Sequence, residues 1–65
     1  MGWVVYYREV ASGREMKSPE APTEQLALDW ACGRLRDWDD VLFIEGPNGQ
    51  TVSRRQIDDY CAQMR

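Results

Sequence analysis

Apolar residues at strand spacing open the chain. Positions 3–10 are rich in β-branched and aromatic residues, which predicts a strand over this range. Ala11-Ser12-Gly13 follows as a turn signal, because glycine adopts a positive φ without a steric penalty. We therefore expect the chain to reverse and return as a short, polar strand over 14–17, with Met16 on its buried face.

A second strand-and-turn pattern lies in the other half of the chain. Val41 to Glu45 predicts a strong strand. Gly46-Pro47-Asn48-Gly49 is the best turn signal in the sequence, since proline fixes φ and the next two residues tolerate left-handed geometry. A short return strand over 50–52 completes a second predicted hairpin.

Each predicted hairpin is followed by a helical pattern. Pro22 or Thr23 opens the first helix, which we expect to end near Asp37. Its apolar stripe comprises Ala27, Leu28, Ala31, Leu35 and Trp38, with Cys32 at the margin. Leu26 and Trp30 fall on the other side of this helix, where a single buried face would leave them exposed. Gly33 sits in mid-helix and is expected to permit close approach of another backbone.

The second helix is predicted over 54–64. Ser53 and Gln56 have the spacing of a capping box, in which each side chain bonds the other residue's backbone N–H. The helix repeats apolar residues at i, i+3, i+4 and i+7, namely Ile57, Tyr60, Cys61 and Met64. The pattern leaves open whether this stripe packs on the core or on a partner.

The resulting order is β-β-α-β-β-α. It predicts a single small α+β domain over residues 1–65, with a four-stranded antiparallel sheet and the helices packed on one face. A chain of 65 residues has a small core and marginal stability. Self-association is one route to added stability in scaffolds of this size.

The sequence offers little for catalysis or for metal binding. It has no His, and its two Cys are far apart, so zinc pairs and a Cys nucleophile with a His base are both missing. Asp37, Asp39 and Asp40 are better explained as a solvated helix end than as a cation site. Asp58 and Asp59 point about 100° apart on a helix and make no acid–base pair. We expect no enzyme activity, catalytic residue, metal or cofactor.

The cysteines and the lack of long apolar runs suggest a location. No stretch reaches the roughly 20 apolar residues of a membrane-spanning helix, and no secretory signal is apparent. We therefore expect a cytoplasmic protein without a membrane partner, with Cys32 and Cys61 reduced and acting as small hydrophobic residues. A disulfide requires Cα atoms within about 7 Å, and sequence spacing alone does not decide whether the pair meets.

The aromatic content favours contact with another protein. Three Trp in a chain of 65 residues is a high density, and Trp and Tyr are favoured at the centres of interfaces. The candidate contact residues are Trp3 and Tyr7 on the open sheet face and Leu26 and Trp30 on the helix. We expect a non-enzymatic protein–protein interaction module that self-associates, in the simplest case as a homodimer.

The alternative is a module that binds single-stranded nucleic acid. Aromatic rings on an open sheet face can stack on bases, and nearby cations can meet phosphates. The basic residues near that face are Arg8, Arg14, Lys17, Arg54 and Arg55. The net charge of −3 disfavours this alternative, because nucleic-acid binders usually present a basic face.

Overall fold

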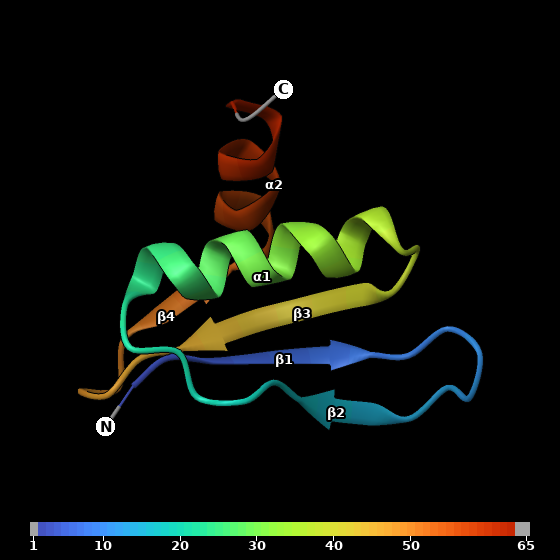
Figure 1. Cartoon of the computed structure of the whole chain (residues 1–65), viewed down its shortest axis with the longest axis horizontal. Helices are drawn as coiled ribbons and strands as arrows, with labels where there is room; N and C mark the ends of the chain where they lie inside the picture. Colours follow the sequence, from blue (N-terminus) through green and yellow to red (C-terminus); the bar gives the residue numbers. More distant parts are fainter. Residues whose placement is uncertain (1, 64–65) are drawn as a thin grey trace.

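The computed structural model describes residues 2–63 and shows one four-stranded sheet and two helices. The elements are β1 (Val4–Arg8), β2 (Glu15–Lys17), α1 (Glu24–Arg36), β3 (Asp40–Glu45), β4 (Thr51–Ser53) and α2 (Arg54–Gln63). The strands are antiparallel in the order β2-β1-β3-β4 (Figure 1). The predicted α+β class and element order are confirmed.

Both helices cover the same face of the sheet. The register aligns Val5 with Ile44 and Ile44 with Val52, and these side chains point into one core. Helix α1 runs along the strands and contacts β1 and β3, whereas α2 runs crosswise to α1 on the β4 side of the sheet and contacts β3 and β4 (Figure 1). The core residues are Val5, Tyr7, Ala27, Leu28, Ala31, Val41, Ile44, Val52 and Ile57.

The two faces of β1 are the reverse of those predicted. Tyr7 is 4% exposed and lies opposite Val41 on the face that the helices cover. Trp3 is on the same face and packs against the core, so the placement of Trp3 and Tyr7 on the open face was wrong. Alternation places Tyr6 on the open face, where it stacks on Phe43 with ring centroids 4.6 Å apart.

Helix α1 begins and ends with well-formed caps. The Thr23 hydroxyl accepts a hydrogen bond from the Leu26 N–H at 3.2 Å, as expected of an N-cap. The helix ends at Arg36 with Asp37 as its C-cap. Trp38 therefore lies beyond the helix, and its prediction as part of the buried stripe was wrong, because it is 85% exposed.

The predicted capping box of α2 is confirmed. The Gln56 N–H donates to the Ser53 hydroxyl at 3.3 Å, and the Ser53 N–H donates to the Gln56 side chain at 2.9 Å. Ile57 is fully buried in the core, so α2 packs on its own chain. The predicted contribution of Met64 lies outside the described residues.

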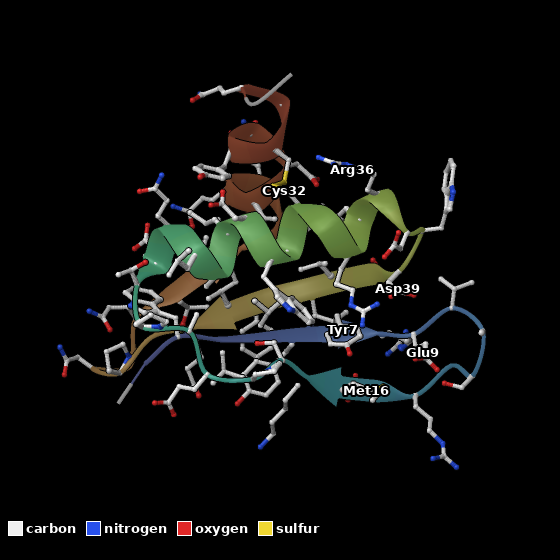
Figure 2. The ribbon with its side chains drawn as sticks, in the orientation of Figure 1. Tyr7, Glu9, Met16, Cys32, Arg36 and Asp39 are labelled. Carbon is white, nitrogen blue, oxygen red and sulfur yellow. A yellow bond between two sulfur atoms is a disulfide. The ribbon has the colours of Figure 1, made fainter. Side chains whose placement is uncertain are left out.

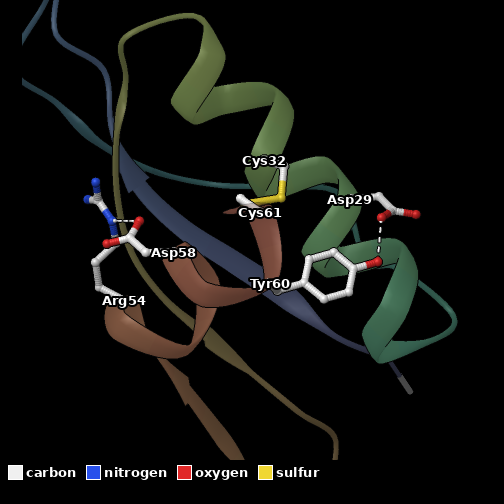
Figure 3. Close-up of a disulfide and its surroundings, with 6 residues drawn as sticks. All are labelled: Asp29, Cys32, Arg54, Asp58, Tyr60 and Cys61. Carbon is white, nitrogen blue, oxygen red and sulfur yellow. Dashed lines mark hydrogen bonds and ion pairs between the residues drawn. A yellow bond between two sulfur atoms is a disulfide. The ribbon is translucent and has the colours of Figure 1, made fainter. Parts of the chain in front are cut away.

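A disulfide joins the two helices. Cys32 on α1 and Cys61 on α2 are bonded, with Cα atoms 5.6 Å apart (Figure 3). The prediction of reduced cysteines was wrong. Both residues belong to helix faces that turn toward each other, and this proximity arises only once the helices pack on the same sheet. Among residues 2–63, no helix is long and apolar enough to cross a membrane.

Substitution by Ala should have opposite effects on stability at Gly46 and at Gly33. A Cβ on Gly46 would lie 2.7 Å from Cζ3 of Trp3, so we expect Gly46→Ala to displace the ring and cost about 1–3 kcal/mol. A Cβ on Gly33 would have no neighbour within 4 Å, so the expected close approach does not occur within this chain. Gly33→Ala should stabilise by about 0.5–1 kcal/mol through helix propensity. Urea denaturation of both variants measures the contrast.

Candidate functional site

Trp38 is the most exposed large apolar residue of the described chain, and it has an unusual backbone conformation. Its φ is 69°, and it is the only non-glycine residue with a positive φ among residues 2–63. The Trp38 N–H donates to the Leu35 carbonyl and the Asp39 N–H to the Arg34 carbonyl, each at 3.1 Å. This pair of bonds is a Schellman motif, in which the left-handed position is usually Gly.

The conformation of Trp38 has a cost that folding does not require. A left-handed L-residue is disfavoured by roughly 1–2 kcal/mol, and Gly would avoid both this strain and the exposure of an indole. Strain of this kind persists where the surrounding structure enforces it and is concentrated at functional sites. Trp38 is therefore the leading candidate for contact with another molecule.

The turn that carries Trp38 is braced by its neighbour Asp39. One carboxylate oxygen of Asp39 accepts from the Arg34 guanidinium at 3.2 Å, and the other accepts from the Val10 N–H at 3.4 Å. The Asp39 side chain is only 10% exposed. It ties α1, the β1–β2 turn and the start of β3 together, so the Trp38 backbone is held from both sides.

The Arg34 guanidinium that binds Asp39 is itself packed against two aromatic rings. Its guanidinium carbon lies 4.9 Å from the Tyr7 ring centroid and 5.1 Å from that of Trp30. Figure 2 shows Tyr7 and Asp39 on the β1 side of α1, whereas Cys32 and Arg36 lie on the α2 side. Stacking on two rings restricts the guanidinium, so the ion pair with Asp39 keeps a fixed geometry.

A cleft of about 600 Å³ lies beside Trp38, between the end of α1, the start of β3 and α2. Its apolar wall consists of Leu35, Ala62 and the Cys32–Cys61 disulfide, and Trp38 itself lies at its edge. The remaining lining residues are Arg36, Asp39, Asp40, Arg54 and Asp58. An apolar wall with a few polar groups around it is typical of sites that accept a side chain or a small molecule.

The charges at the cleft are mostly paired. Arg54 donates to Asp40 at 2.7 Å, to Asp58 at 2.9 Å and to the Val41 carbonyl at 2.9 Å. The hydrogen bond to Asp58 is the main cause that raises the pKa of Arg54, and partial burial opposes it. Arg36 has no hydrogen-bond or ion-pair partner among residues 2–63, which leaves one cation at the cleft for a ligand.

The predicted contact residues are not assembled into one surface. Leu26 is 50% exposed, as expected, but Trp30 packs on Tyr7 with ring centroids 5.2 Å apart. Trp3 is partly buried and Tyr7 lies in the core, so neither is available on the open face. Sequence reasoning missed Trp38, because the apolar stripe was extended one turn too far. The available signal was the run Asp37-Trp38-Asp39-Asp40, which has the polarity of a loop.

The Tyr60–Asp29 bond predicts a response to alkaline pH. The Tyr60 hydroxyl donates to Asp29 at 2.7 Å (Figure 3), and this bond is the main cause that raises the pKa of Tyr60 above its ordinary value of 10.0. A raised pKa in the folded state favours the neutral phenol. Its stabilising contribution is therefore fully present below pH 10 and is lost as the pH rises through the folded-state pKa.

Tyr60→Phe is the variant that tests this dependence. We expect the wild-type free energy of unfolding to fall above pH 10, and this fall to be smaller in the variant, which lacks the ionisable group. Tyr6→Phe is a comparison rather than a silent control: the pKa of Tyr6 is also raised, first by desolvation and then by Glu45, so this variant should remove a separate part of the same fall. An identical alkaline slope in wild type and Tyr60→Phe would contradict the assignment.

The described residues contain no group of three or more His, Cys, Asp or Glu placed to hold a metal ion. What the site offers is an indole on a braced turn next to a partly apolar cleft. This arrangement suits the burial of one molecule's side chain against another. Comparison of the chain with protein-family models, curated proteins and solved structures found no match.

Proposed function

We propose that this protein is a small, non-enzymatic protein–protein interaction module that self-associates, with Trp38 at the centre of the contact. The observation that carries the proposal is the 85% exposure of Trp38 on a turn braced by Asp39. Trp is the residue type most enriched among interface hot spots, and a rigid presentation lowers the entropy cost of association. The indole can bury a large apolar area in a partner without rearrangement of the fold.

The open sheet face gives the nucleic-acid alternative less support. Tyr6 and Phe43 stack on each other with an angle of 14° between their planes, and Lys17 lies 5.7 Å from the Tyr6 ring centroid. Arg8 on the same face is paired with Glu15 at 3.2 Å. Rings and cations that are already engaged must give up these contacts before they bind bases and phosphates.

The cellular compartment of the protein depends on the redox state of its two cysteines. The sequence suggested the cytoplasm on the assumption of reduced cysteines, whereas disulfides persist mainly in oxidising compartments. The bonded Cys32–Cys61 pair removes that assumption. Differential alkylation of protein taken directly from cells measures the oxidised fraction. A fully reduced pair favours the cytoplasm, and a fully oxidised pair favours an oxidising compartment.

Replacement of Trp38 by Gly tests the function through two opposite effects. Gly relieves the left-handed strain, so we expect Trp38→Gly to raise the free energy of unfolding of the monomer by about 1 kcal/mol. The same change removes the contact centre, so self-association should weaken by at least tenfold. Urea denaturation at low protein concentration measures the first effect, and sedimentation over a concentration series measures the second.

Leu26→Ser is the matched control for this experiment. Leu26 is exposed but lies at the opposite end of α1, outside the site. Its substitution should leave sedimentation unchanged. A wild-type protein that stays monomeric at millimolar concentration would contradict self-association, and an unchanged affinity in Trp38→Gly would contradict the role of Trp38.

A further inference from the structure

We infer that the acceptor for Trp38 is the cleft of a second copy of this chain, and that two copies exchange their indoles across a two-fold axis. The inference rests on the proposed self-association and adds its geometry. The cleft is lined by Leu35, Ala62 and the Cys32–Cys61 disulfide, and Trp38 stands at its edge. The projecting group and the hollow that would receive it therefore occupy one continuous surface.

A closed dimer of this kind requires the projecting side chain and the cleft that receives it to lie next to each other on the surface. In an interface with two-fold symmetry, residue i of one copy meets residue j of the other, and j meets i. A projection beside a hollow satisfies this condition twice, once in each direction. A projection far from its hollow would instead favour head-to-tail contacts, which form a ring or an open chain of molecules. The position of Trp38 on the rim of the cleft therefore favours a dimer over a polymer.

The cleft has room and chemistry for an indole. Its volume of about 600 Å³ falls within the roughly 300–1,000 Å³ of sites that hold compounds larger than an indole. Leu35, Ala62 and the disulfide provide apolar contact. Arg36 also lines the cleft without a partner among residues 2–63, and a guanidinium over an indole face is a favourable pair.

The paired charges at the cleft limit the desolvation cost when an indole covers them. Arg54 is already bonded to Asp40 and Asp58, so an incoming indole covers a satisfied network around Arg54. The unpaired Arg36 gains the contact with the indole face instead. The contact area is small, because each copy contributes one large side chain and the rim around it. We therefore expect a weak dimer, with a Kd in roughly the micromolar range or above.

Two complementary variants test the exchange. Trp38→Gly removes the indole, which is one side of the cleft, but keeps the apolar wall of Leu35, Ala62 and the disulfide, whereas Ala62→Arg fills the cleft but keeps the indole. Ala62 is an exposed residue of α2, so its substitution leaves the core intact. Each variant alone should dimerise at least tenfold more weakly than wild type. An equimolar mixture should form a heterodimer that keeps one of the two indole–cleft contacts, detected by native mass spectrometry with one variant isotope-labelled.

Controls separate this inference from the proposed function. Gln63→Arg adds the same charge to the neighbouring residue, which does not line this cleft, and should dimerise like wild type. Ala62→Glu reverses the added charge and should still block the cleft, and circular dichroism checks that each variant is folded. If Trp38→Gly is monomeric but Ala62→Arg still dimerises, the exchange of indoles is contradicted, whereas self-association through Trp38 is not. A monomeric wild type would overturn both, and a mixture without heterodimer would overturn the exchange.

Discussion

Removal of the Cys32–Cys61 disulfide is expected to lower the free energy of unfolding by about 3–4 kcal/mol. The bond closes a loop across a sequence separation of 29 residues. In the chain-entropy description, a cross-link of this length removes about 3.5 kcal/mol of freedom from the unfolded state. A chain of 65 residues has a total stability of roughly 3–10 kcal/mol, so this single bond accounts for a large share.

The measurement is urea denaturation of the wild type with and without a dithiol reductant, next to the Cys32→Ala/Cys61→Ala double variant. Reduced wild type and the double variant should unfold at similar, lower urea concentrations. Amide exchange should accelerate first in α2, the terminal element that the bond ties to α1. The reductant should have no effect on the double variant, which is the control. A loss below about 1 kcal/mol would contradict the prediction, because chain entropy alone exceeds it.

Local patterns in the sequence were sufficient for the elements of this fold. The two turn signals, the Ser53–Gln56 capping box and the helical stripes each depend on residues a few positions apart. Local patterns did not determine which face of β1 is buried. Alternation separates Val5 and Tyr7 from Val4 and Tyr6 but does not say which set the helices cover. That choice depends on the register with β3, which pairs Val5 with Ile44.

The candidate site was less accessible to sequence reasoning than the fold. Trp38 continues the apolar stripe of α1 in the sequence, and only the Schellman bonds at the helix end remove it from the core. The cleft beside it combines residues of α1, β3 and α2, which meet through tertiary packing. The disulfide likewise depends on two helices that share one sheet face. An exposed tryptophan was expected, but the exposed residue is Trp38, which the apolar pattern had assigned to the buried stripe.

Ile57→Ala is expected to destabilise the protein by about 2–5 kcal/mol. Ile57 is the only residue of α2 within 2–63 that is fully buried, and it packs against the sheet and α1 in the single core. Its truncation leaves a cavity that a small core cannot easily close. The other attachments of α2 include the disulfide, the Tyr60–Asp29 bond and the bonds from Arg54 to Asp40 and to the Val41 carbonyl. Urea denaturation of the oxidised variant measures the loss.

Ile57→Val is the graded control, with an expected cost of about 0.5–1.5 kcal/mol, because it removes one methylene group. The combination of Ile57→Ala with Cys32→Ala/Cys61→Ala measures how strongly the two attachments depend on each other. Once the disulfide is absent, α2 can detach, so the further loss from Ile57→Ala is bounded by the free energy of α2 docking. We therefore expect the combined cost to be smaller than the sum of the separate costs. Strict additivity would show instead that α2 stays docked until the whole domain unfolds.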